Sequence, residues 1–271
     1  MSEHSQVRYW VYELPKIGRT TFSIEDAESQ FPGKPKASVR RALARLSEAG
    51  RIHSVWKGFY AISLPEYGIN GIAPPLDYID QLMRHLNTRY YVALLTAAAY
   101  TGAAHHAPQV FYFISDSNLH AKSKFGVTIE PIYKKAIPEK YITEINSRSA
   151  SVKISSPELT AIDLVAYVKR VGGISHVATV LAELSESMDF QKVDADFFNG
   201  VSAAAVQRLG YVLDEELEKK ELAESLFEKA KQSKVAFNAV PLIADRNSQL
   251  TAIEKNKKWN VIVNYRIEND L

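Results

Sequence analysis

The sequence predicts an α+β fold with a small N-terminal winged helix-turn-helix followed by a larger mixed α/β domain. Three observations support this prediction. Residues 1–64 contain three helical patterns and then two β-rich runs that flank Lys57-Gly58. The segment 65–75 is rich in proline and glycine, which predicts a linker between domains. From 76 to 271 helical and extended patterns alternate, as in a second domain.

The composition is that of a globular protein. The chain has 271 residues, of which 46% are hydrophobic and 10% aromatic, enough to bury a core. The absence of cysteine excludes disulfides, thiolate zinc sites and cysteine nucleophiles, and it suits a reducing compartment, so we expect a cytoplasmic location. The N-terminal segment MSEHSQVRYWVYELPK is charged and does not resemble a signal peptide.

One uncharged run has the composition of a membrane span but not its length. Residues Tyr90–Ala104 form a run of about 15 residues, shorter than the roughly 20 that a helix needs to cross a bilayer. We therefore expect a buried core helix there and no membrane partner.

Capping patterns and turn residues define the N-terminal elements. The predicted elements are helices over Gln6–Leu14, Ile24 to about Gln30 and Pro35–Ala49, and a hairpin made of IHSVW and FYAIS. Ser23 and Asp26 have the spacing of a capping box at the start of the second helix. Gly50 is expected to end the third helix, and Lys57-Gly58 to turn the hairpin.

The second segment alternates helices and strands. The expected helices are Leu76–Asn87, Ala93–Tyr100, Pro157 to about Val171, His176–Glu186, Ala203–Leu213 and Glu215–Lys231, and the expected strands are Val110–Ser115, Gly126–Tyr133, Val152–Ile154 and Trp259–Ile267. The start at Ser156-Pro157-Glu158 is well defined. A serine N-cap, a proline in the first turn and an acid at the positive end of the helix dipole all favour a helix start.

The third helix carries an unusual charge pattern. Between Lys34 and Lys57 there are seven Lys or Arg residues and one acid, Glu48, although the net charge of the chain is only +2. On a helix with about 100° per residue, one stripe is apolar, formed by Val39, Ala42, Leu43 and Leu46. The cations and small residues lie on the other side, which suits a helix that enters the major groove of duplex DNA. The predicted DNA-binding residues are Lys34, Lys36, Ser38, Arg40, Arg41, Arg45 and Lys57. Arg41 and Arg45 are expected at base edges and the others at phosphates.

Two alternatives to DNA binding remain open. A Lys- and Arg-rich face of an amphipathic helix is usually a solvated surface, and winged helices also serve as protein interaction modules. The order of capping box, Pro-Gly break, basic helix and Lys-Gly hairpin favours double-stranded DNA as the partner.

Three blocks of sequence resemble one known family. They are RALARLSEAGRIHSVWKGFYAIS at the end of the first domain, VKISSPELTAIDLVAYVKRVGG (Val152–Gly173) and VQRLGYVLDE (Val206–Glu215). The second block is similar to the pattern V-S-S-P-E-x-T-x-x-D-L followed by a double glycine, and the third to R-L-G-Y-x-L-E. With these blocks the chain resembles the AbiEi-type antitoxins of the AbiE (type IV) toxin-antitoxin, or abortive infection, family.

The resemblance implies a function in phage defence. It implies an antitoxin that neutralises a co-encoded nucleotidyltransferase-like toxin, without the need for a stable complex, and a transcriptional repressor that binds inverted repeats in the promoter of its own operon. It also marks an antitoxin motif, formed by Ser156, Pro157, Glu158 and Asp163. The alternative is a ligand-responsive winged-helix regulator without a toxin partner.

The sequence contains no evident enzyme motif. Gly172-Gly173 lacks the lysine and the spacing of a phosphate-binding loop, and G-x-S-x-G is absent. We therefore expect no enzyme, no catalytic residue, no cofactor and no metal.

Three further features have a structural and a functional interpretation. Asp163 falls on the apolar side of its helix, so we expect it to bond to a backbone N–H or to an arginine such as Arg208. His105-His106 lack the spacing of metal ligands and are expected in a loop. The stretch Asp214–Glu228 has seven acids and two lysines and is expected to be a solvated helix. Its alternative role is a contact surface for a basic partner or for the DNA-binding domain of the same protein.

Overall fold

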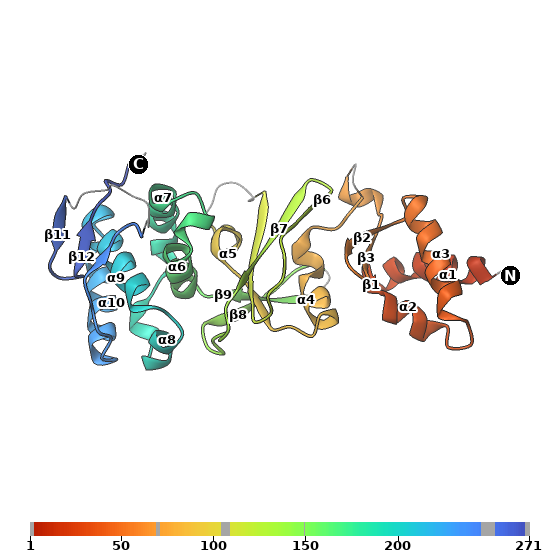
Figure 1. The fold of residues 1–271 in the computed structure, drawn as a ribbon, viewed down its shortest axis with the longest axis horizontal. Coiled ribbons are helices and arrows are strands. Elements are labelled where there is room, and N and C mark those ends of the chain that lie inside the picture. The colour runs from red at the N-terminus through yellow and green to blue at the C-terminus, as the bar shows by residue number, and fades with distance from the viewer. Residues whose placement is uncertain (1–2, 69–70, 104–108, 149, 245–252, 269–271) are drawn as a thin grey trace. The chain divides into compact units, whose positions relative to one another are not determined.

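The computed structural model describes residues 3–68, 71–103, 109–148, 150–244 and 253–268 (Figure 1). The chain divides into two compact units. Unit 1 comprises Met1–Tyr90, His120–Ile129 and Glu144–Lys153, and unit 2 comprises Tyr91–Leu119, Glu130–Thr143 and Ile154–Leu271. Helices and several sheets are present, which confirms the α+β class. None of the helices in the described ranges is long and apolar enough to cross a membrane.

Unit 1 begins with three helices and a small sheet. Its elements before residue 90 are α1 (Glu3–Glu13), β1 (Thr21–Ser23), α2 (Ile24–Gln30), α3 (Lys36–Glu48), β2 (Ile52–Trp56), β3 (Phe59–Ile62) and α4 (Pro75–His85), with short 3-10 helices at Leu14–Ile17 and Pro65–Tyr67. The strands form an antiparallel sheet in the order β1-β3-β2. The sequence did not predict β1, because three buried residues are too short to show an alternating pattern.

Local signals in unit 1 are confirmed. The Ser23 hydroxyl accepts a hydrogen bond from the Asp26 N–H at 3.0 Å, and the Asp26 carboxylate accepts one from the Ser23 N–H at 2.8 Å, which is the predicted capping box. The apolar stripe of α3, from Val39 to Leu46, is buried in one cluster with Val7 and Val11 of α1. The opposite side of α3 is therefore the side that faces solvent.

A six-stranded sheet has the strand order β6-β7-β5-β4-β9-β8. Its strands are β4 (Tyr90–Val92), β5 (Val110–Ser115), β6 (Lys122–Lys124), β7 (Val127–Tyr133), β8 (Ile142–Asn146) and β9 (Ser151–Ser155). The predicted strand over Val110–Ser115 is confirmed. The uncharged run Tyr90–Ala104 was expected to be one buried helix, and this was wrong at its start. Aromatic and β-branched residues form β4 there, and the helix α5 (Leu94–Tyr100) follows.

The remaining elements of unit 2 are mostly helical. They are α6 (Pro157–Ala166), α7 (Ile174–Leu184), α8 (Ala195–Asn199), α9 (Ala203–Tyr211), α10 (Lys220–Gln232), 3-10 helices at Val168–Arg170, Ser185–Ser187 and Phe190–Lys192, a π-helical turn at Val212–Glu216, and the strands β10 (Val240–Pro241), β11 (Glu254–Asn256) and β12 (Val261–Val263) in the order β10-β12-β11. Figure 1 shows α9 and α10 beside β12.

Three predicted boundaries in unit 2 were wrong. The helix expected to reach Val171 ends at Ala166, because a 3-10 turn follows before the glycine pair. The helix expected from Glu215 begins only at Lys220, because Glu218 adopts a positive φ of 54° after the π-helical turn.

The terminal strand is also shorter than expected. It covers Val261–Val263 instead of Trp259–Ile267. The indole of Trp259 is fully buried, and Asn260 has a φ of 52°, so the chain turns at these two residues instead of extending.

Candidate functional site

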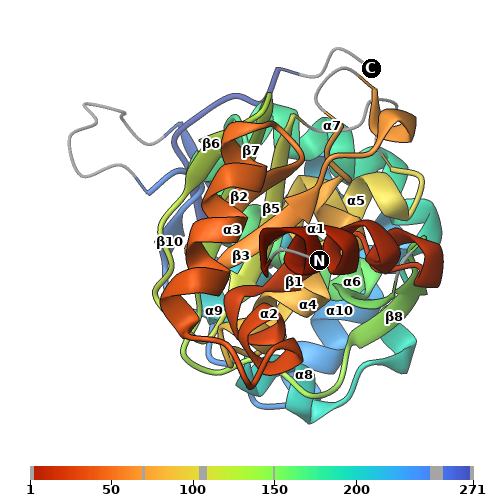
Figure 2. The same cartoon turned by 90° about the vertical axis from the view of Figure 1, so that its right-hand side faces the viewer.

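The predicted DNA-binding residues lie on α3, just before it at Lys34, and at the turn of the β2–β3 hairpin that follows it. Figure 2 shows these elements of the backbone. Four of the α3 residues are exposed, namely Lys36, Arg40, Arg41 and Arg45. Lys34 and Ser38 are half-buried, and Lys57 is exposed at the hairpin turn. The structure therefore places these seven side chains on one helix, the residues just before it and the strand turn after it.

An acid of α2 engages two of these cations. The Glu28 carboxylate lies 2.8 Å from Arg40 Nε and 3.2 Å from Lys36 Nζ, and its side chain is only 9% exposed. The hydrogen bond from Arg40 is the main reason that the pKa of Glu28 is lowered. Lys36 and Arg40 are thus held in fixed positions and partly neutralised. This contact was not predictable from a local pattern, since Glu28 belongs to the preceding helix.

The other cations have neutral neighbours. Lys34 Nζ lies 5.4 Å from the centroid of the Phe31 ring, and Arg41 Nε donates to the Ala37 carbonyl oxygen at 3.3 Å. Within the described ranges, no carboxylate forms an ion pair with Arg41, Arg45 or Lys57. Their charges remain available to an anionic partner.

The turn of the β2–β3 hairpin is fixed at its backbone. The Gly58 carbonyl oxygen accepts a hydrogen bond from the Ile24 N–H at 2.8 Å, and the Lys57 carbonyl oxygen lies 3.3 Å from His85 Nε2. Gly58 has a φ of 73°, a conformation that favours glycine. The hairpin is short, and these bonds hold it against α2 and α4. Lys57 is exposed and is the only cation at the turn among the described residues.

The start of α6 brings together three residues of the antitoxin motif. Ser156 is the N-cap, as predicted, and its hydroxyl accepts from the Leu159 N–H at 3.3 Å. The same hydroxyl donates to the Glu158 carboxylate at 2.7 Å, and the other oxygen of Glu158 accepts from the Asp189 N–H at 2.8 Å. Pro157 occupies the first turn. The Ser156 and Glu158 side chains are therefore engaged inside the fold of unit 2.

Asp163 is buried with 1% exposure, and its partners differ from the expected ones. Its carboxylate accepts a hydrogen bond from the Tyr91 hydroxyl at 2.8 Å and forms an ion pair with Lys134 Nζ at 3.4 Å. Arg208, the expected partner, instead donates Nε to the Pro241 carbonyl oxygen. Burial raises the pKa of Asp163, while the charge of Lys134 opposes that shift. Sequence reasoning missed Lys134 and Tyr91, because they lie 29 and 72 residues away in the chain.

The VQRLGYVLDE block holds the C-terminal segment of unit 2. The Gln207 side-chain amide donates to the carbonyl oxygens of Asn238 and Trp259, both at 2.7 Å. Gly210 packs so closely against the Trp259 ring that a Cβ atom at this position would overlap it. The block therefore has a packing role in the structure.

The acidic stretch is only partly a solvated helix. Its first residue, Asp214, has 3% exposure and accepts hydrogen bonds from Trp259 Nε1 at 3.0 Å and Lys258 Nζ at 2.8 Å. Lys220 lies 3.0 Å from the other oxygen. The expectation was wrong at Asp214, because a buried indole N–H requires an acceptor. Further along the stretch, most acidic side chains of α10 are exposed.

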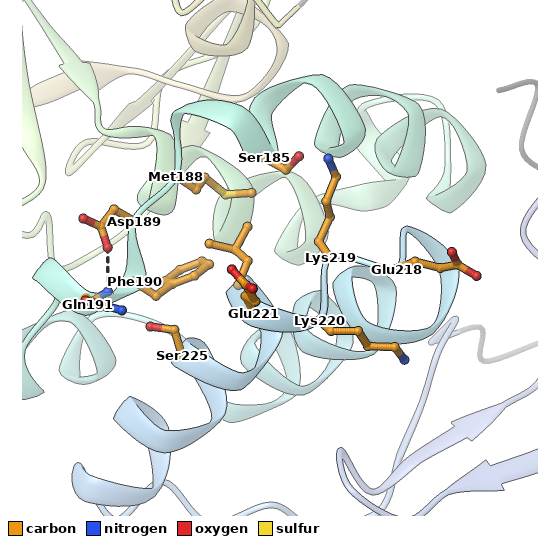
Figure 3. Close-up of a pocket in the computed structure, with 11 residues that line it drawn as sticks. Ser185, Met188, Asp189, Phe190, Gln191, Glu218, Lys219, Lys220, Glu221 and Ser225 are labelled. Atoms are coloured by element: carbon orange, nitrogen blue, oxygen red, sulfur yellow. Dashed lines mark hydrogen bonds between the residues drawn. The ribbon is translucent and has the colours of Figure 1, made fainter.

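A cavity of about 560 Å³ lies beside the start of α10 (Figure 3). Met188, Phe190 and Leu222 supply its apolar lining, and Lys219 and Glu221 supply charges. Its volume is in the range of small-molecule sites. Figure 3 also shows Asp189, whose side chain accepts from the Gln191 N–H at 3.0 Å.

No metal site is evident in the part of the chain that the structure describes, where no three His, Asp or Glu side chains form a cluster. The predicted loop at His105-His106 lies outside the described residues.

The structure thus defines an α+β protein with a basic helix in unit 1 and an internally bonded polar block in unit 2. Residues 91–215 match the family model described as AbiEi antitoxin C-terminal domain. This match includes the motif at α6 and the VQRLGYVLDE block. A comparison with curated proteins found no match.

The fold is similar to that of a bacterial protein of known structure. The RV2827C protein from Mycobacterium tuberculosis superposes with a TM-score of 0.64 at 13% identity, over 95% of this chain and 90% of that chain. At this identity the similarity shows the fold alone. An antigenic nucleotidyltransferase-like protein from Paracoccidioides brasiliensis reaches a TM-score of 0.37 at 18% identity, over 60% of this chain and 95% of that chain, which is too low for a conclusion.

Proposed function

We propose that this chain is an antitoxin that represses its own operon and neutralises a co-encoded nucleotidyltransferase-like toxin. The observation that carries the proposal is the match of residues 91–215 to the AbiEi antitoxin C-terminal domain. In this proposal unit 1 binds inverted repeats of double-stranded DNA in the promoter. The chain acts in the cytoplasm as a non-enzymatic regulator.

The DNA-binding part of the proposal is supported by the order of elements in unit 1. Three helices, a first strand before the second helix and a hairpin after the third helix are the elements of a winged helix-turn-helix. We assign α3 as the recognition helix, with Arg41 and Arg45 at base edges. The residues assigned to phosphates are Lys34, Lys36, Ser38, Arg40 and Lys57. Two protomers on an inverted repeat would place one α3 in each half-site.

The antitoxin part of the proposal concerns the α6 motif. Ser156, Pro157, Glu158 and Asp163 face the interior or cap the helix, so we propose that they shape the surface around α6. Antagonism of the toxin then depends on that surface and requires no stable complex with the toxin.

A double substitution tests the assignment of α3. The variant Arg41→Ala, Arg45→Ala should lose sequence preference for a duplex taken from upstream of its own gene, by about 1–3 kcal/mol for each base contact. Fluorescence anisotropy against a shuffled duplex measures this preference.

Lys57→Ala should instead weaken binding to both duplexes equally. As a control, Lys192→Ala, Lys231→Ala removes two exposed cations of unit 2 and should change neither the sequence preference nor the affinity for the two duplexes. Unchanged preference in the α3 variant would show that the recognition helix lies elsewhere.

Co-expression tests the antitoxin part. Expression of a nucleotidyltransferase-like protein encoded in the adjacent gene should arrest growth, and this chain should restore it. Failure of a soluble, folded chain to restore growth would refute the antitoxin activity while leaving DNA binding to be judged on its own.

The second candidate is a ligand-responsive regulator without a toxin, and the cavity beside α10 is the observation that favours it. Specific binding of its own promoter without rescue from the toxin would support this candidate. Rescue from the toxin would exclude it.

A further inference from the structure

A second hairpin belongs to unit 1. In it β6 pairs with the start of β7, with Lys122 opposite Ile129 and Lys124 opposite Val127. The two turn residues, Phe125 and Gly126, have φ values of 55° and 81°. Positive φ at both positions is typical of the tight turn that matches the twist of a β-hairpin.

This hairpin is attached to β2, an edge strand of the three-stranded sheet. Lys124 Nζ donates to the Ser54 carbonyl oxygen at 2.9 Å, and Lys122 Nζ lies 4.5 Å from the centroid of the Trp56 ring. The Phe125 ring meets His53 edge to face, with centroids 4.8 Å apart. Three contacts along β2 therefore fix the position of the hairpin relative to that strand.

β2 itself is connected to the basic helix. Only Ala49, Gly50 and Arg51 separate α3 from β2, and the Arg51 N–H donates to the Leu46 carbonyl oxygen of α3 at 2.9 Å. The second hairpin thus lies beside the strand that leaves the C-terminal end of α3.

The hairpin adds positive charge without acids. The segment 117–129 contains two lysines and one histidine and neither Asp nor Glu. The contacts that hold Lys122 and Lys124 are a ring face and a carbonyl oxygen, so neither charge is neutralised by them. This differs from Lys36 and Arg40, which share the carboxylate of Glu28. An ammonium group also keeps donors for a further acceptor.

We propose that the β6–β7 hairpin is a second DNA-contacting element, in which Lys122 and Lys124 bind phosphates of the duplex that α3 reads. This inference rests on the proposed DNA binding by unit 1. The turn of the short β2–β3 hairpin is bonded to Ile24 and His85, which limits its reach. In this proposal the second hairpin supplies the contacts to the DNA backbone beyond α3. Because phosphates carry no sequence information, the hairpin adds affinity and not specificity.

The salt dependence of binding tests the proposal. The variant Lys122→Gln, Lys124→Gln should reduce the slope of log K against log salt concentration by about 2, since each phosphate contact contributes roughly 0.9. The measurement uses fluorescence anisotropy between about 50 and 200 mM salt on a promoter duplex and a shuffled duplex. The ratio of the two affinities should stay unchanged.

Two controls separate phosphate contact from a structural role. Lys122→Arg, Lys124→Arg keeps the charges and should retain the slope. Lys192→Gln, Lys231→Gln removes the same charge from unit 2 and should also retain it. A thermal melt shows whether the glutamine variant is folded. If it is not, Ala121→Glu, at an exposed position of the same segment, should weaken binding to both duplexes.

The outcomes are distinguishable. A wild-type slope in the folded glutamine variant, or unchanged binding by the Ala121→Glu variant, would overturn the hairpin proposal. If in the same assays the Arg41→Ala, Arg45→Ala variant loses sequence preference, DNA binding by α3 stands and only the hairpin proposal fails. Absence of duplex binding by the wild-type chain would overturn both.

Discussion

The exposed side of α3 and the start of α6 are both dense in polar residues, but they use them in opposite ways. On α3 the cations are exposed, and among the described residues only Lys36 and Arg40 pair with a carboxylate, that of Glu28. At α6 the polar groups are bonded within unit 2, and Ser156 and Asp163 have exposures of only 8% and 1%.

This difference separates an exposed charged surface from a buried structural motif. A polyanion can be bound only by charges that are exposed and not already neutralised. A polar group that is buried needs its partners for stability and has no capacity left for a ligand. The block at α6 therefore has a structural role, and the antitoxin proposal places any effect on a toxin at exposed residues around it.

The largest expected effect is at the buried ion pair of unit 2. Lys134→Met should lower the free energy of unfolding by about 3–5 kcal/mol, because it leaves the Asp163 carboxylate buried without its cation. The pKa of Asp163 is already raised by burial from its ordinary 3.8, so its contribution to stability falls as pH rises above that value. Loss of Lys134 raises this pKa further, so the deficit of the variant should grow as pH rises, which a comparison at about pH 5 and about pH 8 measures.

Urea unfolding at both pH values measures this effect. The double variant Lys134→Met, Asp163→Asn removes both charges and should recover part of the stability, with little pH dependence. A deficit of Lys134→Met that is the same at both pH values would contradict a buried ion pair.

An intermediate effect is expected at Gly210. The variant Gly210→Ala should destabilise unit 2 by about 1–3 kcal/mol, because the new Cβ overlaps the buried ring of Trp259. Thermal unfolding followed by tryptophan fluorescence is the measurement. Gly33→Ala is a matched control, since no atom lies within 4 Å of its Cβ position and its φ is not positive. Equal stability of the two variants would refute the packing role of the R-L-G-Y block.

The smallest effect on stability, with a clear effect on binding, is expected at Glu28. The variant Glu28→Gln frees Lys36 and Arg40, and it should increase the affinity for any duplex several-fold and steepen its salt dependence. The lowered pKa of Glu28, due mainly to the bond from Arg40, keeps the carboxylate ionised at neutral pH, so the wild-type pairs persist during the assay.

Glu139→Gln removes an exposed acid from unit 2 and serves as control. Weaker binding by Glu28→Gln would show that Glu28 helps by positioning its cations rather than by competing with phosphates.

Much of unit 1 was predictable, because its signals are local. The Ser23–Asp26 capping box, the stripe from Val39 to Leu46 and the turn at Gly58 depend on residues within a few positions of one another. The same holds for the N-cap at Ser156 in unit 2. The family match over 91–215 also agrees with the resemblance that the motif at α6 indicated.

Tertiary contacts decided the state of each charged group. Glu28 reaches Arg40 across 12 residues, Lys134 reaches Asp163 across 29, and Lys124 reaches Ser54 across 70. No helical or strand period relates such positions, so neither the partner of Asp163 nor the hairpin beside β2 was predictable from the sequence pattern.

The sequence by itself determined the three helices of the N-terminal segment and the cations that α3 carries opposite its apolar stripe, because backbone preferences and hydrophobic periodicity act over a few residues. Only the tertiary structure decided which of those charges are free and which are paired. The environment of a charge is set by burial and by neighbours that come from distant parts of the chain.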